Sequence, residues 1–229
     1  MERGTSLRHY SLAASGFELV PGAIARARCA EIAHLLDERD SISLGSRRLL
    51  DQPWCRELAV DLRRHPRIAA LIPEAWVVAQ CTLFEKSRAT NWLVPLHQDL
   101  SIPVRERVEH PELSGWSIKE EGHFVQPPAE LLAMLVAVRL HIDPCDQQDG
   151  PLRVVPGSHH AGKLSPEASA ELRNRSGETS CIAEAGDALL LRPLLLHASS
   201  KATGSSQRRV LHFLWGPPAL PCGLSWPVS

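Results

Sequence analysis

From residue 76 to residue 215 the chain is a succession of short apolar segments, rich in β-branched residues and separated by turn signals. Such segments are typical of β-strands, and the Gly-Pro and Pro-Gly pairs at 150–151 and 156–157 are typical of the turns between them. The expected strands are residues 76–87, 92–96, 131–142, 150–155, 188–197 and 208–215. They do not alternate with helical segments as βαβ units would, so the pattern predicts an antiparallel, double-sheet jelly roll.

Two segments before residue 76 have the periodicity of helices. Residues 21–39 repeat apolar side chains at helical spacing, and residues 53–64 do so until His65 and Pro66 interrupt the pattern. We expect these N-terminal helices, within about residues 21–65, to pack on the outside of a sheet. A chain of 229 residues can bury one full core. The prediction is therefore one domain, residues 1–229, mainly β with flanking helices and a jelly-roll core at about residues 76–215.

Residues 101–130 break the regular series of expected strands. A connection of this length inside a compact domain is usually a functional loop or a poorly ordered one. We predict that it forms a lid over an active site. Its Arg105, Arg107 and Trp116 side chains are then candidates for substrate recognition.

The charge balance directs the search for a partner to small molecules. The chain has 25 Lys and Arg residues against 26 Asp and Glu residues, which gives no reason to expect nucleic acid or an anionic membrane as a partner. The longest apolar run, residues 131–140, contains Arg139 and is too short to span a bilayer, and the N-terminus lacks the apolar core of a signal peptide. We expect a cytoplasmic monomer or homodimer whose six widely spaced cysteines are reduced thiols.

Three residues at the ends of apolar segments form a candidate metal site. His97 and Asp99 are two residues apart, so in extended chain they project from the same face with Cα atoms about 7 Å apart. His197 ends a second apolar segment that a jelly roll could place alongside the first. Two imidazoles and one carboxylate leave coordination positions open, which suits iron(II) oxygenases. The His-x-Asp pattern alone is weak, because His97 could also be an ordinary surface histidine at a strand end.

Residues after His197 could bind a carboxylate group. Ser199 shares the strand face of His197, and Arg208 and Arg209 open the next expected strand. A guanidinium beside a hydroxyl is a good carboxylate receptor, but strand alternation allows only one of the two arginines to enter the barrel. We favour Arg208 and interpret Arg209 as a solvated surface residue.

A further polar face lies on the expected strand at 76–87. Thr82 shares this face with Gln80, Phe84 and Lys86. Thr82 is an additional candidate for cosubstrate binding, whereas solvent exposure explains Lys86 equally well.

Taken together, these motifs resemble the phytanoyl-CoA dioxygenase family of iron(II)/2-oxoglutarate oxygenases, from about Gly16 to Trp215. The resemblance is carried by His97-Gln98-Asp99, by Asp149-Gly150-Pro151-Leu152 leading to Val155-Pro156-Gly157-Ser158-His159, and by His197-Ala198-Ser199 with Arg208. It implies a double-stranded β-helix (cupin-like) fold, with His97, Asp99 and His197 as catalytic iron ligands. It also implies that Ser199 and Arg208 hold 2-oxoglutarate, and the interval between His197 and Arg208 is the one usual in the family.

The reaction implied by the resemblance consumes iron-bound 2-oxoglutarate and O2, releases succinate and CO2, and oxidises a C–H bond of a small molecule. The carboxylate of Asp99 favours hydroxylation, because related halogenases lack it so that chloride can bind. Arg139 and His141 share a strand face and are candidates for substrate binding, as are Asn91 and Trp92 just before the metal strand. An internal ion pair with Asp143 is an equally good explanation of Arg139.

Two other classes of function fit parts of this pattern. A jelly-roll binding protein could keep the barrel and a metal without consuming 2-oxoglutarate. A zinc hydrolase could use the same His and Asp ligands to activate water, although it has no evident need for the pairing of Ser199 with Arg208.

Overall fold

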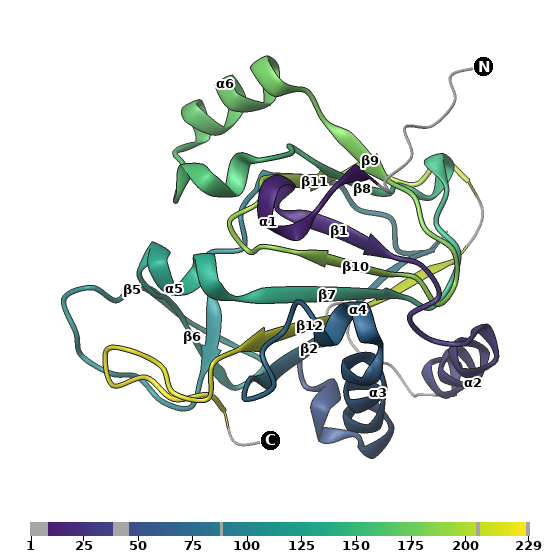
Figure 1. The fold of residues 1–229 in the computed structure, drawn as a ribbon, viewed down its shortest axis with the longest axis horizontal. Coiled ribbons are helices and arrows are strands. Elements are labelled where there is room, and N and C mark those ends of the chain that lie inside the picture. The colour runs from purple at the N-terminus through teal and green to yellow at the C-terminus, as the bar shows by residue number, and fades with distance from the viewer. Residues whose placement is uncertain (1–8, 39–45, 88, 205–206, 228–229) are drawn as a thin grey trace.

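Two antiparallel sheets face each other and a third, smaller sheet flanks them (Figure 1). The computed structural model describes residues 9–38, 46–87, 89–204 and 207–227. The first sheet has the strand order β1 (Phe17–Val20), β10 (Ala188–Leu191), β7 (Val136–His141), β12 (Arg208–Gly216) and β2 (Val77–Lys86). The second has the order β3 (Val94–His97), β11 (His197–Ser199), β8 (Leu152–Val154) and β9 (Thr179–Cys181). This arrangement confirms the predicted jelly-roll core.

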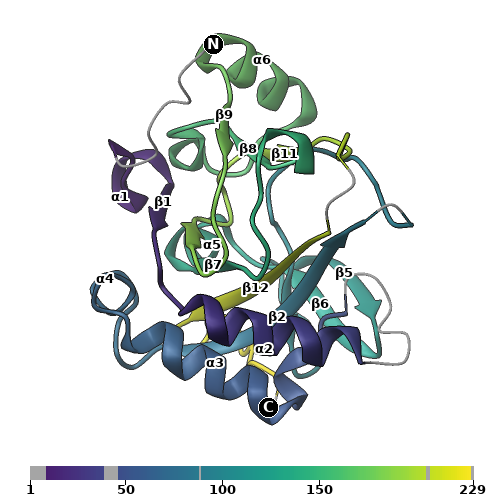
Figure 2. The same cartoon turned by 90° about the vertical axis from the view of Figure 1, so that its right-hand side faces the viewer.

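Helices cover the outer face of the first sheet (Figure 2). They are α2 (Arg26–Asp37), α3 (Pro53–Arg64) and the short α4 (Pro66–Ala69), while α1 (Leu12–Ser15), α5 (Ala129–Met134) and α6 (Pro166–Ser176) lie elsewhere. The described residues also include the 3-10 turns η2 (Leu49–Asp51), η3 (Gln147–Asp149) and η4 (Ser158–Ala161). As predicted, α3 ends before His65 and Pro66, because a proline disfavours helical backbone in the residue before it. The N-terminus of α2 was predicted too early, since residues 21–24 form a turn and bend.

Alternation along the strands separates an apolar outer face from a polar inner face in the first sheet. The outward residues, such as Leu83, Leu140 and Phe213, pack with α2 and α3 in the largest hydrophobic cluster. The inward residues form rows across β2, β12 and β7 that are set by the strand register. These rows are Gln80, Leu214 and Ala137; Thr82, His212 and Arg139; Phe84, Val210 and His141; and Lys86 with Arg208. The barrel interior therefore becomes more cationic toward the end marked by Lys86.

Two segments predicted as single strands are divided. Residues 131–142 begin as α5, and only Val136–His141 forms β7. Residues 188–197 form β10 in one sheet, then turn at Pro193 and Leu194 so that His197 begins β11 in the other sheet. A long apolar run does not distinguish a strand from a buried helix or turn, which is why these boundaries were wrong.

Residues 101–130 are more regular than predicted. They contain β4 (Ile102–Val104), β5 (Ser114–Lys119) and β6 (Gly122–Gln126), which form the third sheet in the order β4-β6-β5. Leu224 and Trp226 near the C-terminus pack against this sheet, and the Arg105 amide donates to the Ser225 carbonyl at 2.9 Å. The segment is a small sheet anchored by the C-terminal residues, and its predicted role as a lid stays a prediction.

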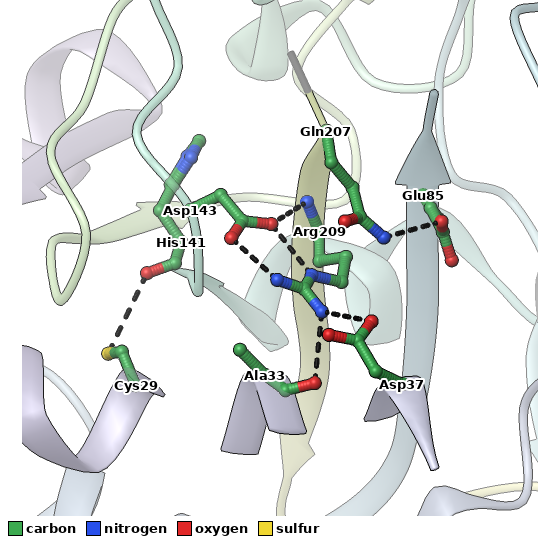
Figure 3. A network of polar contacts seen from close by, with 8 residues as sticks. All are labelled: Cys29, Ala33, Asp37, Glu85, His141, Asp143, Gln207 and Arg209. Atoms are coloured by element: carbon green, nitrogen blue, oxygen red, sulfur yellow. Dashed lines mark hydrogen bonds and ion pairs between the residues drawn. The ribbon is translucent and has the colours of Figure 1, made fainter. Parts of the chain in front are cut away.

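Arg209 is buried on the outer face of β12, which contradicts the interpretation of a solvated surface residue (Figure 3). Its guanidinium donates to both carboxylate oxygens of Asp143, at 2.8 and 2.9 Å. It also donates to Asp37 at 2.7 Å and to the Ala33 carbonyl at 3.0 Å, both at the end of α2. Asp143 is therefore the partner of Arg209 and not, as considered above, of Arg139.

Two further observations concern the cysteines and the apolar segments. All six cysteines are free thiols, and five of them are buried. Among the described residues, no helix combines the length and the apolar character required to cross a bilayer.

Candidate metal and cosubstrate site

The three predicted metal ligands converge where β3 and β11 pair. His97 is the last residue of β3 and His197 the first of β11, and the two are directly opposite each other in the register. Their ring centroids are 4.2 Å apart. Asp99 follows β3, and its amide donates to the Pro193 carbonyl at 2.9 Å, which holds the carboxylate beside both histidines.

The side-chain geometry suits a single metal ion. The Nε2 atoms of His97 and His197 each lie 3.7 Å from a different oxygen of the Asp99 carboxylate. One ligand atom from each of the three residues lies within 4.8 Å of the others. The Nδ1 atoms face carbonyl oxygens, at 2.8 Å from Pro95 for His97 and 2.9 Å from Leu195 for His197. Since a carbonyl only accepts, each Nδ1 must donate, which leaves the Nε2 lone pairs available to a metal.

Burial and charge also prepare these groups for coordination. Burial lowers the pKa of His197 to about 4, despite the opposing effect of Asp99, so the ring is neutral at neutral pH. For His97, burial alone would lower the pKa, but its interactions with Asp99 raise it. Burial alone would raise the pKa of Asp99, but His197 and His97 hold it well below its usual range. A neutral imidazole beside an ionised carboxylate is the state that binds a divalent metal.

Gln98 and Ser158 position the metal-ligand segments, and neither was assigned a role from the sequence. The Gln98 amide donates to the carbonyls of Gly162 and Leu194, each at 2.7 Å, and its oxygen accepts from the Leu164 amide at 2.9 Å. Ser158 Oγ accepts from the Leu196 amide at 2.8 Å, just before His197. Both residues lay within the quoted motifs, but only the hydrogen bonds show their positioning role.

The carboxylate-binding candidates lie together deeper in the barrel. Ser199 Oγ and Arg208 Nη1 both donate to the Gly150 carbonyl, at 3.2 and 2.6 Å. Lys86 joins them, with its ammonium 2.5 Å from Ser199 Oγ. Lys86 is only 1% exposed, so solvent exposure does not explain it.

Thr82, Arg139 and His212 form an inward row of the first sheet, and one further row separates it from Lys86 and Arg208. Thr82 and Arg139 are buried, and Arg139 Nη1 lies 3.3 Å from His212 Nδ1. The Arg139 guanidinium also lies over the Phe84 ring, 5.1 Å from its centroid. Burial, with repulsion from Arg208, lowers the pKa of Arg139 to about 10, so it remains charged at neutral pH.

Two of the candidate metal ligands, His97 and Asp99, line a cavity of about 260 Å³. Thr82, Phe84 and His212 line it together with His97 and Asp99. A second cavity of about 460 Å³ extends toward β5 and β6. The two cavities share the lining residues Arg47, Gln80, Lys119 and Phe124. The two cavities therefore adjoin each other. Of the four shared residues, Gln80 lies on the polar face predicted for the strand at 76–87, whereas Arg47, Lys119 and Phe124 were not predicted.

The predicted substrate residues are dispersed. Arg105 lines the larger cavity, and Arg139 and His141 lie inside the barrel. Trp116 and Trp92 are absent from the described lining of both cavities, and Arg107 lies over the Trp116 ring at 5.6 Å.

Asn91 forms hydrogen bonds with a distant segment of the backbone. Its side chain forms two hydrogen bonds of 2.8 Å with the backbone of Ala202. It therefore connects the segment before β3 to the segment after β11.

Comparison with known proteins places this geometry in a family. The model of the phytanoyl-CoA dioxygenase family matches residues 16–210. The chain belongs to the phytanoyl-CoA dioxygenase family. Members of this family use iron(II), 2-oxoglutarate and O2, so the predicted family and cofactors are confirmed. A comparison with curated protein sequences found no match.

Solved structures show the same fold. HygX from Streptomyces hygroscopicus, crystallised with nickel and 2-oxoglutarate, aligns with a TM-score of 0.63 and 17% identity, over 93% of this chain and 87% of HygX. AviO1 from Streptomyces viridochromogenes Tue57 aligns with a TM-score of 0.61 and 21% identity, over 92% of this chain and 93% of AviO1. SnoN, an α-ketoglutarate-dependent epimerase from nogalamycin biosynthesis, has a TM-score of 0.62 and 17% identity, over 93% of this chain and 81% of SnoN.

Family membership and the donor set agree on an iron and 2-oxoglutarate oxygenase type of function. Two imidazole nitrogens and a carboxylate match the ligand set of non-haem iron(II) oxygenases. The residues present therefore fit iron(II).

Proposed function

We propose that the protein hydroxylates a C–H bond of a small molecule, with His97, Asp99 and His197 as the iron(II) ligands. The observation that carries this proposal is the position of the three ligands, which lie between an open cavity and a buried cationic group. The cavity provides a place for the substrate, and Arg208 with Ser199 provides a place for the distal carboxylate of 2-oxoglutarate.

Bound iron would supply the activation of O2, and the protein residues would bind, orient and shield the reactants. One oxygen atom of O2 enters succinate as 2-oxoglutarate loses CO2, and the other enters the substrate as a hydroxyl group. Arg208 would hold the distal carboxylate through charge-assisted hydrogen bonds. Ser199 and Thr82, which face the same interior, would complete the polar contacts to 2-oxoglutarate.

The cavity favours a small polar substrate. Charged and polar side chains are common to the linings of both cavities, including Arg47, Gln80 and Lys119. The related HygX and SnoN structures were crystallised with hygromycin B and nogalamycin RO, respectively. Arg105 at the larger cavity and Arg139 inside the barrel are the proposed substrate contacts from the predicted set.

Metal binding tests the ligand assignment. Anaerobic addition of iron(II) and 2-oxoglutarate should give the weak visible charge-transfer band of their chelate. Asp99→Ala and His197→Ala should abolish the band, whereas His160→Ala, which changes an exposed histidine outside the site, should retain it. No band in the wild type, or an unchanged band in both ligand variants, would contradict the proposal.

A second experiment tests which arginine binds the cosubstrate. Arg208→Ala should weaken 2-oxoglutarate binding by about 10- to 100-fold, since hydrogen bonds to charged groups contribute about 1.5–3 kcal/mol. Arg209→Ala removes an outer-face contact and should change this affinity far less. Calorimetric titration of the folded variants measures both, and the reverse ranking would show that Arg209 is the ligand.

The reaction type is tested on the product. Once a compound screen coupled to succinate release identifies a substrate, mass spectrometry should find one added oxygen atom. A chlorinated product, or an epimer of unchanged mass, would show that the oxidation does not end in hydroxylation.

A further inference from the structure

The deepest row of the barrel places two cations opposite each other. Lys86 on β2 and Arg208 on β12 are directly paired in the antiparallel register. Both are buried, at 1% and 4% exposure. Like charges directly opposite on neighbouring strands destabilise a sheet, and burying a charge without a counter-ion costs more free energy still.

The described residues supply no compensating anion to this pair. In the part of the chain that the structure describes, neither Lys86 nor Arg208 forms an ion pair with a carboxylate. Lys86 donates instead to Ser199 Oγ and to the Ser200 carbonyl. Arg208 donates to the Gly150 carbonyl, and its buried Nε has no hydrogen-bond partner. These neutral acceptors satisfy some donors and leave two positive charges unbalanced.

The location of the pair indicates which anion would balance it. Ser199, which contacts Lys86, is two residues beyond His197 on β11, about 7 Å along a strand. A five-carbon dicarboxylate chelated at the metal could bridge that span with its free carboxylate. A substrate entering through the cavities would meet Phe84 and His212 first, because these residues line the smaller cavity and precede Lys86 and Arg208 in the barrel rows.

We propose that Lys86 is a second cationic ligand for the distal carboxylate of 2-oxoglutarate, acting together with Arg208. The inference rests on the proposed function and adds to it a residue that discriminates 2-oxoglutarate from 2-oxo acids without a second carboxylate. Burial, with repulsion from Arg208, lowers the pKa of Lys86 to about 8. A bound carboxylate favours the charged ammonium, which adds Coulomb attraction to the hydrogen bonds.

The test compares two ligands in one variant. Lys86→Met removes the charge and keeps an unbranched side chain. Calorimetry on the anaerobic iron(II) protein measures its affinity for 2-oxoglutarate and for pyruvate. Pyruvate lacks the distal carboxylate. We expect the affinity for 2-oxoglutarate to fall about 10- to 100-fold. The affinity for pyruvate should change less than about 2-fold, because pyruvate loses no charge-assisted hydrogen bond in this variant. Lys163→Met is the matched control, because Lys163 also donates to a backbone carbonyl, that of Pro127 at 2.6 Å, but is exposed outside the barrel.

Two outcomes overturn the inference. Unchanged 2-oxoglutarate affinity in Lys86→Met would show that Lys86 does not contact the cosubstrate. A parallel loss for both ligands would show that Lys86 only supports the local backbone. Failure of the wild type to bind 2-oxoglutarate at all would instead contradict the proposed function.

A second variant keeps the test valid if Lys86→Met does not fold. Lys86→Gln retains a donor for Ser199 and the Ser200 carbonyl but carries no charge, so the same selective loss of 2-oxoglutarate affinity is expected. Equal retention of both ligands in Lys86→Gln would overturn the inference.

Discussion

Gly150 is the residue on which the contacts at the cosubstrate end converge. Its carbonyl accepts from Ser199 and Arg208, and its backbone has a φ of +63°. A Cβ atom at this position would lie 2.4 Å from the Ser200 carbonyl oxygen and 3.1 Å from Lys86 Nζ. Glycine at this turn is thus required both for the backbone conformation and for the close approach to the charged groups.

Gly150→Ala is expected to lower the free energy of unfolding by more than about 2 kcal/mol. A left-handed backbone conformation costs about 1–2 kcal/mol for a residue with a Cβ atom, and the clash of this atom with Ser200 adds to that cost. Gly22→Ala is the matched control, since Gly22 has a φ of +62° and no atom within 4 Å of the added Cβ. Urea denaturation measures both. Equal losses in the two variants would show that the close approach at Gly150 contributes nothing.

Neighbouring arginines on β12 serve two different purposes. Arg208 faces the barrel interior, and Arg209 faces the helices, because successive side chains of a strand alternate. Arg209 connects Asp143, after β7, to the C-terminal end of α2 (Figure 3). The helix is therefore fastened to the sheet by a buried ion pair as well as by apolar packing.

Arg209→Ala should destabilise the protein by about 3–5 kcal/mol, the usual result of leaving one partner of a buried ion pair unpaired. Asp37→Ala should cost less than about 1 kcal/mol, since the Asp37 side chain is 56% exposed and its pair is screened by solvent. Chemical denaturation compares these variants with the double variant Arg209→Ala and Asp143→Ala. The double variant should recover part of the stability that Arg209→Ala loses. A larger loss in Asp37→Ala than in Arg209→Ala would contradict this account.

The inward rows described for the first sheet contain basic side chains, and two buried histidines among them affect the stability of the protein in acid. Burial, with repulsion from Arg139, lowers the pKa of His141 and of His212 to about 3 each. In the unfolded chain these groups titrate near pH 6.5. Below that pH the unfolded state binds more protons, so stability is lost as pH falls toward the folded-state values.

The metal-free protein should therefore lose free energy of unfolding between about pH 6.5 and pH 4, at up to about 1.4 kcal/mol per pH unit for each buried histidine. His141→Gln removes one of these groups and should reduce the slope by about that amount. Denaturation curves recorded across this pH range provide the measurement. A slope identical to that of the wild type would show that His141 is protonated equally in both states.

Short-range sequence patterns were sufficient to predict two of the three candidate metal ligands and much of the fold. The spacing of His97 and Asp99 allows both side chains to face one candidate metal site from a strand end, and the apolar periodicity of residues 53–64 predicts α3. These features depend on neighbours within a few positions. The alternation along β12 likewise allowed the two arginines to be assigned to opposite faces before their partners were known.

Three features could be found only in the tertiary structure. They are the burial of Lys86 and Arg209, the division of residues 188–197 between two sheets, and the strands within residues 101–130. Each is decided by which distant segment lies opposite, such as Arg208 across from Lys86 or Asp37 beside Arg209. The sequence pattern around a charged side chain in a strand is the same whether solvent or another strand covers that side chain. Only the packing of the sheets and helices resolves the two cases, because burial is a property of neighbours in space and not of neighbours in sequence.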